Sequence, residues 1–279
     1  MAIAPHGEET RMLRKIGAAL RDLLIGLAVT VVVTVPWSVI AAANLRQSPR
    51  VPWAIPVGLT YLGLAVAYLS GHGWPTTTTA FRQRDFRFRR MSGVQWRWSL
   101  LTGVLAVTCL WLLYAALGNL GGAPTSPGRE AALPAGVLFI FLLVSAAVTA
   151  IGEEGGLRGF AQARLERRFG PRVAIVASTL AFVLIHATHG LPMLVRMAPF
   201  YVAVGVVYGL LAYLTQSILP AVALHFVGDT VTFGLRSSLI RLSGPQSGVA
   251  ILLCLGSGVV LGALSLFAFR RLAAVGVSA

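Results

Sequence analysis

Long apolar runs dominate this sequence and constrain its fold more than any other feature. Because a helix needs about 20 residues to cross the hydrocarbon of a bilayer, each run has the length of a membrane span. Only 11% of the residues are charged, against about 25% in soluble domains, and the mean hydropathy is +0.78. These values exclude an ordinary soluble domain. The runs cover residues 23–43, 51–70, 99–118, 131–152, 173–195, 197–224 and 249–269.

The run from residue 197 to 224 is too long for one span. Thr215-Gln216-Ser217 and Pro220 indicate a turn and a new helix start, so we divide the region into spans at 197–214 and 218–235. We therefore predict an all-α polytopic membrane protein, a bundle of about eight transmembrane helices. No long polar stretch is left for a separate domain, and residues 1–279 form a single transmembrane domain.

Basic residues lie in short clusters between the runs. With the N-terminus placed in the cytoplasm, 17 of the 23 fall on the cytoplasmic side, as the positive-inside rule requires. Both termini are then cytoplasmic. Despite the net charge of +14, we expect no nucleic-acid partner: the Arg- and aromatic-rich residues 81–98 fit an interfacial segment on anionic headgroups better than an RNA-binding one. Residues 11–43 resemble a signal peptide but are long for one, and we expect them to be retained.

Several ionisable residues lie within the spans or at their ends, where they are costly: about 2.5–3.5 kcal/mol each at the bilayer centre. Such groups usually face the bundle interior, pair with one another and mark function. Any one of them alone would be an ordinary hydrogen-bonded interior group, but the set together suggests a site. The set comprises Glu153, Glu154, His186, His189, His225 and Asp229.

The spacing of these residues predicts that they converge. Glu154 and Arg158 are four residues apart and can pair on one helix face. His225 and Asp229 have the same spacing and also share a face. Gly170-Pro171 predicts a turn between helices 134–169 and 172–187, which would place Glu153 and His186 at the same height. The first of these helices would extend beyond the membrane into the cytoplasm. In the same helix, three glycines would either permit close helix packing or thin the wall of a substrate groove: Gly155, Gly156 and Gly159.

Carboxylate and imidazole groups in such a cluster are ligands for zinc or another divalent metal. Without a metal, a Glu–His pair can activate water as a general base. Both routes lead to hydrolysis. The sequence has no G-x-S-x-G serine elbow and no H-E-x-x-H zinc motif. Cys109 and Cys254 lie in apolar runs and are interpreted as small buried hydrophobic residues.

Three motifs occur in order: Glu153-Glu154-x-x-x-Arg158, Phe182-x-x-x-His186 and His225-x-x-x-Asp229. This pattern resembles the CPBP family of intramembrane proteases, also called the CAAX-protease and bacteriocin-processing or Abi family. The resemblance implies an endopeptidase in which Glu153 and His186 activate water. His225 and Asp229 would stabilise the oxyanion, or all four residues would hold a metal, while Glu154 and Arg158 orient the site. It also implies a catalytic core over residues 131–235.

Two other functions remain open: a non-catalytic immunity or scaffold protein that keeps the protease fold, and a transporter that uses the cluster as a proton relay. The Arg-rich, Lys-poor composition fits a GC-rich bacterial genome, so we expect a multi-pass protein of the bacterial inner membrane. A peptide or a membrane protein is the expected substrate. Gly205-x-x-x-Gly209 is interpreted as an internal packing motif, and His189 as a spare polar residue at the membrane exit.

Overall fold

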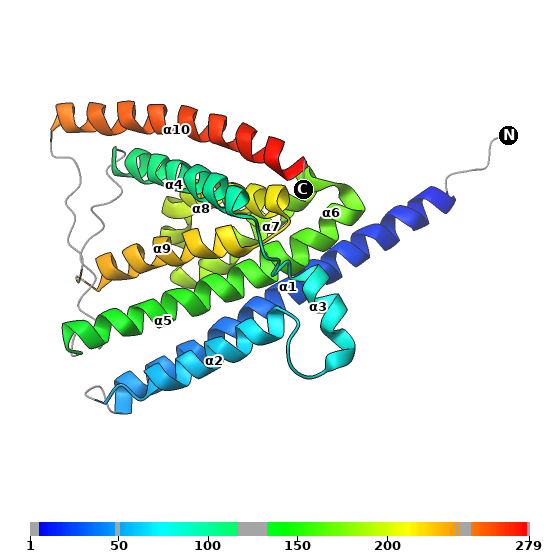
Figure 1. The fold of residues 1–279 in the computed structure, drawn as a ribbon, viewed down its shortest axis with the longest axis horizontal. Coiled ribbons are helices and arrows are strands. Elements are labelled where there is room, and N and C mark those ends of the chain that lie inside the picture. The colour runs from blue at the N-terminus through cyan, green and yellow to red at the C-terminus, as the bar shows by residue number, and fades with distance from the viewer. Residues whose placement is uncertain (1–5, 48–50, 117–132, 238, 240–246, 278–279) are drawn as a thin grey trace.

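A computed structural model describes residues 6–47, 51–116, 133–237, 239 and 247–277, and every regular element within them is helical (Figure 1). Six helices are long and apolar enough to cross a membrane, and two shorter apolar helices span Ala54–Leu69 and Leu219–Leu235. These eight helices correspond to the eight predicted spans and confirm the polytopic all-α fold. Residues 117–118 and 131–132, at the ends of two predicted spans, lie outside the described residues.

The elements follow one another in this order: α1 (His6–Gln47), α2 (Ala54–Leu69), η1 (Thr76–Thr78), α3 (Thr79–Asp85), α4 (Gly93–Ala116), α5 (Ala135–Glu153), η3 (Glu154–Gln162), α6 (Ala163–Phe169), α7 (Pro171–Ile185), η4 (His186–His189), α8 (Leu191–Thr215), α9 (Leu219–Arg236) and α10 (Gly248–Val277).

The central rod of the bundle is the continuous helix Ala135–Phe169, formed by α5, η3 and α6. In the most apolar 18-residue stretch of this helix, 50% is buried inside the protein. The corresponding share for α10 is 11%, and α10 packs along α4 at the periphery of the bundle (Figure 1). The apolar side chains that α10 exposes can face lipid at no hydrophobic cost, since lipid tails are themselves apolar. The helix that carries the first motif is therefore surrounded by protein on most sides.

The turn predicted at Gly170-Pro171 is confirmed. Gly170 ends α6 with φ of 81°, a left-handed value that suits glycine, and Pro171 begins α7. The predicted span 173–195 is wrong at its far end, because α7 stops at Ile185 and α8 already begins at Leu191. Gly190, with φ of 93°, breaks the chain direction there, and Pro192 in the first turn favours a new helix start.

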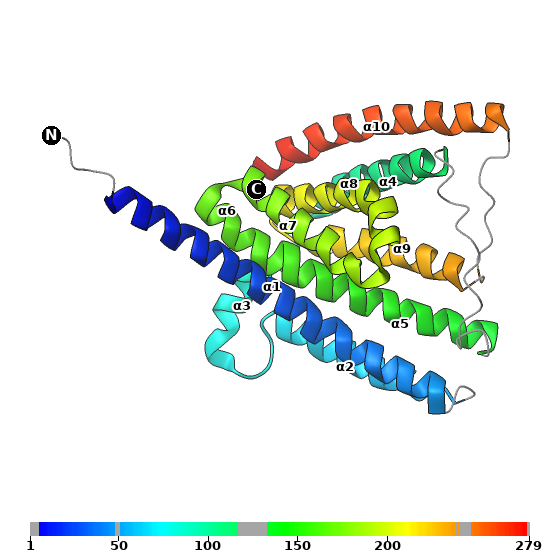
Figure 2. The ribbon, with the colours of Figure 1, turned by 180° about the vertical axis from the view of Figure 1, so that it is seen from behind.

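Both ends of the chain lie at one end of the bundle. The start of α1 and the end of α10 are on the same side as α3 and α6 (Figures 1 and 2). A chain that crosses the membrane an even number of times begins and ends on the same side. Together with the basic clusters of α3 and α6, this arrangement agrees with the predicted cytoplasmic location of the two termini.

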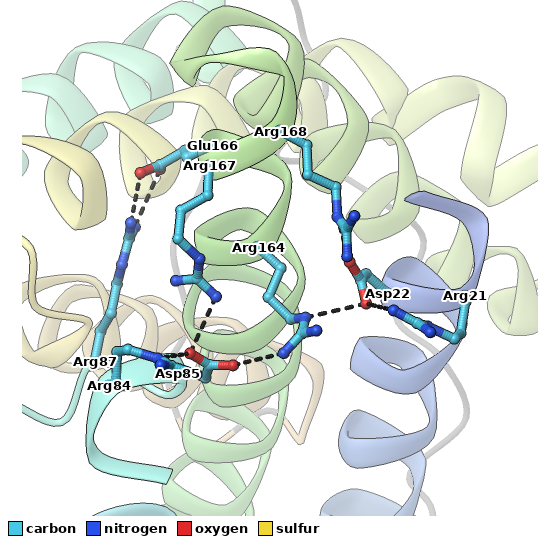
Figure 3. Close-up of polar contacts among 9 residues, drawn as sticks. All are labelled: Arg21, Asp22, Arg84, Asp85, Arg87, Arg164, Glu166, Arg167 and Arg168. Carbon is cyan, nitrogen blue, oxygen red and sulfur yellow. Dashed lines mark hydrogen bonds and ion pairs between the residues drawn. The ribbon is translucent and has the colours of Figure 1, made fainter. Parts of the chain in front are cut away.

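Two buried aspartates tie α1 and α3 to α6 at this end (Figure 3). The Asp22 carboxylate accepts hydrogen bonds from Arg164 at 3.0 Å and Arg168 at 3.1 Å. The Asp85 carboxylate accepts them from Arg164 at 2.8 Å and Arg167 at 3.0 Å. Both aspartate side chains are fully buried, so the arginines supply the charge compensation that burial requires. The sequence pattern did not reveal these partners.

Asp85 lies outside the membrane-spanning helices, and its surroundings set its pKa. Burial alone would raise the pKa of the carboxyl. Hydrogen bonds from Arg84 and Arg164 and the charges of Arg167 and Arg84 outweigh burial, so the pKa is lowered. Asp85 therefore stays ionised at neutral pH and holds α3 on the central helix.

Candidate active site

The first motif lies where the central helix changes from α-helix to a π-helical segment. Glu153 is the last residue of α5, and Glu154 begins the nine residues of η3, all of which are buried. Segments of π-helix are rare and are frequently found at functional sites. The widened turn occurs at the two adjacent carboxylates that the sequence singled out.

Glycine allows α1 to approach this segment closely. A Cβ atom built on Gly26 would lie 2.6 Å from the carbonyl oxygen of Gly156, and one built on Gly156 would overlap the carbonyl oxygen of Gly26. The predicted close packing is therefore present at these positions. Gly205 and Gly209 of α8 also contact this segment, as expected of an internal packing motif. Their carbonyl oxygens accept hydrogen bonds from Arg158 at 3.4 Å and Gln162 at 2.8 Å.

Glu154 and Arg158 form the predicted ion pair. Nη1 of Arg158 lies 3.1 Å from Oε1 of Glu154, and both side chains are fully buried. The guanidinium also lies over the ring of Phe182, 4.4 Å from its centroid, where a cation–π attraction adds to the pairing. A charge at this depth needs such compensation because its desolvation is costly.

His225 of α9 occupies the centre of the cluster. Its Nδ1 lies 2.9 Å from Oε1 of Glu154. Its Nε2 lies 3.5 Å from Oδ2 of Asp229 and 3.9 Å from Oε2 of Glu153. Because a carboxylate oxygen only accepts, the Nδ1–H donates to Glu154 and leaves Nε2 facing Glu153 and Asp229. The structure thus brings the side chains of the first and third motifs together, with Glu154 as the link between Arg158 and His225.

Glu153 is 8% exposed. Its Oε2 is buried, and within the described part of the chain it takes part in no hydrogen bond. A buried carboxylate oxygen normally has a hydrogen-bond partner. The lone pairs of this oxygen are therefore available to accept a proton, whereas those of a carboxylate that holds the fold together are used in hydrogen bonds.

The His186 ring packs on Phe182, whose ring also contacts that of His225. Its ring centroid is 4.7 Å from that of Phe182 and 4.0 Å from that of Tyr201, and the Phe182 and His225 rings are 5.9 Å apart. Nδ1 of His186 lies 2.7 Å from the Phe182 carbonyl oxygen, so this nitrogen carries the hydrogen and Nε2 has the lone pair in the neutral ring. The contacts connect His186 to the cluster through aromatic rings. The predicted pairing of Glu153 with His186 stays a prediction.

Two tyrosines of α8 were missed by the sequence analysis. Tyr201 packs on His186, and Tyr208 stacks on His225 with ring centroids 5.4 Å apart and planes 23° apart. They are seven residues apart, two helical turns, and so share one face of α8. This spacing within an apolar helix is the signal that could have identified them.

The four residues Glu153, His186, His225 and Asp229 were also predicted as ligands of a divalent metal. In the described ranges, no group of three or more His, Cys, Asp or Glu side chains has an arrangement suited to holding a metal ion. We therefore derive no step through a metal. The side chain of His189, the predicted spare histidine, lies outside the described residues.

Fold and site together define a class: a polytopic helical membrane protein with acid and histidine side chains gathered in its interior. Residues 134–231 match the family model described as type II CAAX prenyl endopeptidase Rce1-like. This segment, about a third of the chain, is therefore similar to the CAAX-protease family, and the resemblance drawn from the three motifs is confirmed. All seven motif residues lie within the match. No curated protein and no solved structure matches the chain.

Proposed function

We propose that the protein is an intramembrane endopeptidase that hydrolyses a peptide bond with water activated by Glu153 and His186. The observation that carries the proposal is the buried Oε2 of Glu153, which accepts no hydrogen bond within the described residues and lies 3.9 Å from Nε2 of His225. These groups lie in the segment that matches a family of endopeptidases.

Proton transfer begins at Glu153. A water molecule within hydrogen-bond distance of Oε2 donates its proton there, and its oxygen attacks the scissile carbonyl carbon. Nε2 of His186, with its lone pair kept by the Nδ1–H bond to Phe182, is the second acceptor for the water. After the tetrahedral intermediate forms, Glu153 returns the proton to the leaving amine as the C–N bond breaks.

Charge stabilisation falls to His225 and Asp229. His225 in its protonated form donates from Nε2 to the oxyanion, and a donor fixed in advance is worth about 2.7–4 kcal/mol in such sites. Asp229, 3.5 Å from that nitrogen, compensates the charge of the ring. Glu154 holds Nδ1 of the ring, and Arg158 holds Glu154, so these two orient the donor.

For the substrate and location we propose a peptide or membrane protein cleaved at the bacterial inner membrane. The divalent metal predicted from the sequence, for which carboxylate and imidazole side chains are the usual ligands, stays a separate prediction with its own test. Chelation followed by zinc addition tests it: activity lost and then recovered would support a metal, and activity unaffected by the chelator would count against one.

The proposal is tested by comparing membrane and secreted peptides from cells that express the wild type or Glu153→Ala at matched levels. Peptides that disappear with the variant would establish proteolysis and identify the substrate. His186→Ala should have the same effect, and His189→Ala, a matched histidine outside the motifs, should not. Identical peptide sets for wild type and Glu153→Ala would favour the scaffold or immunity alternative. A lost solute flux with unchanged peptides would favour transport.

A further inference from the structure

A basic hollow of about 1000 Å³ opens at the cytoplasmic end of the bundle, between the ends of α2, α6 and α8 and the residues that follow α3. It is separate from the candidate active site. Glu166 on its wall lies 13 residues, about three helical turns, beyond Glu153 along the central helix. Its charged lining consists of Arg84, Arg87, Arg89, Arg90, Arg167 and Glu166.

The positive charge of the basic hollow is only partly compensated. Arg87 is mostly buried and pairs with Glu166 through both of its terminal nitrogens (Figure 3). Arg84 and Arg167 share the Asp85 carboxylate. With both acids counted against the five arginines, three positive charges remain. This excess favours a ligand with more than one negative charge.

Two arginines are left to bind such a ligand. Arg89 and Arg90 are exposed, and neither side chain has a hydrogen bond or ion pair with any residue that the structure describes. Their segment is nevertheless held in place by its backbone. The Arg87 carbonyl accepts a hydrogen bond from the Ile218 N–H at 3.1 Å, and the Arg89 carbonyl accepts one from the Ser217 hydroxyl at 2.9 Å.

Backbone strain is concentrated at the same place. Among the described residues, Arg87 and Gln216 are the two non-glycine residues with positive φ, 54° and 50°, and both line the basic hollow. Such conformations cost of order 1–3 kcal/mol and cluster at functional sites, including sites that clamp ligands. The fold maintains this cost in two neighbouring segments that line one cavity and are hydrogen-bonded to each other.

We propose that the basic hollow binds a phosphate group, carried by an anionic phospholipid of the cytoplasmic leaflet or by a soluble phosphate compound. Guanidinium groups bind phosphate in bidentate geometry, and a multivalent anion matches the excess charge better than a single carboxylate. Trp74, between α2 and α3, is 86% exposed. Tryptophan is enriched at membrane interfaces, and Trp74 lies two residues after His72, which lines the hollow, so lipid headgroups would lie near this wall.

The test uses the purified full chain in detergent and two kinds of probe. Cardiolipin, a phospholipid with two phosphate groups and two negative charges, is titrated and its binding followed by native mass spectrometry, and inorganic phosphate and glycerol 3-phosphate are titrated by calorimetry. Saturable binding of the lipid alone would assign the lipid source, and binding of the soluble probes would assign the soluble source. No saturable binding of any probe would overturn the proposal.

Paired variants separate a site from general charge. Arg89→Gln/Arg90→Gln should weaken phosphate binding about tenfold or more, because two charge-assisted hydrogen-bond donors are lost. Arg11→Gln/Arg14→Gln removes the same charge from exposed positions of α1 and should leave binding unchanged. Equal weakening by both pairs would overturn the proposal, as would competition by acetate as effective as that by phosphate. Because no proteolysis is measured, the outcome is independent of the proposed enzyme activity.

Discussion

The buried pair of Glu154 and Arg158 yields the most quantitative prediction. Among the described residues, replacing Glu154 by Ala leaves the fully buried guanidinium of Arg158 with the Gly205 carbonyl oxygen at 3.4 Å and the rings of Phe182 and Tyr208. It also removes the acceptor for Nδ1 of His225. A charge that was compensated becomes unpaired in the membrane interior.

The expected loss of stability is large. Removing one partner of a buried ion pair costs about 3–5 kcal/mol, and each kcal/mol shifts the thermal midpoint by about 2–4 °C in a chain of this size. We therefore expect Glu154→Ala to lower the thermal midpoint of the detergent-solubilised protein by about 10 °C. Thermal unfolding followed by tryptophan fluorescence measures it.

The double variant Glu154→Leu/Arg158→Met is the control. Apolar side chains of similar volume leave no unpaired charge, so much of the lost stability should return, although activity should not, since His225 still lacks its acceptor. A double variant as unstable as Glu154→Ala, or a Glu154→Ala protein as stable as wild type, would refute the reasoning from unpaired charge.

Three further predictions concern ring stacking, helix packing and pH. Tyr208→Phe keeps the ring that stacks on His225 and should cleave peptides nearly as well as wild type, whereas Tyr208→Leu loses a ring contact worth about 0.5–1.5 kcal/mol and should slow cleavage. Gly156→Ala forces a Cβ into the backbone of α1 and should cost about 1–3 kcal/mol of unfolding free energy; Gly17→Ala, where a Cβ meets nothing within 4 Å, should not destabilise the protein. The pKa of Asp85 is lowered in the folded state. The ionised Asp85 side chain therefore stabilises the fold above its unfolded pKa of about 3.9, and this stabilisation is lost as the pH falls toward its pKa in the folded protein. Thermal midpoints measured down the acid range should therefore drop less steeply for Asp85→Asn than for wild type, and parallel curves would contradict this assignment.

Local patterns predicted much of this structure because they depend on neighbours in the chain. The spans follow from run length, and the Glu154–Arg158 and His225–Asp229 contacts follow from a spacing of four residues. The hairpin at Gly170 follows from a turn signal. Each of these needs no knowledge of the other helices.

Contacts between distant segments could not be predicted in this way. Glu154 and His225 are 71 residues apart, and nothing in either motif indicates that the orienting carboxylate holds the ring nitrogen. The partners of Asp22, 142 and 146 residues away in α6, likewise depend on how α1 crosses the central helix. The break at Gly190 was missed because the residues on both sides of it are apolar, so that hydropathy alone shows one run.

The π-helical segment has a consequence for how this sequence can diverge. Each residue of a helix turns the chain by about 100°, so one deletion between Glu154 and Gln162 would rotate everything beyond it relative to α5. Arg164, Arg167 and Arg168 would then no longer face the aspartates of α1 and α3. Substitutions can be tolerated one at a time, but an insertion or deletion here disturbs both ends of the rod together. We therefore expect relatives to vary in composition along this helix while they preserve the number of residues between its two carboxylates and its arginine cluster.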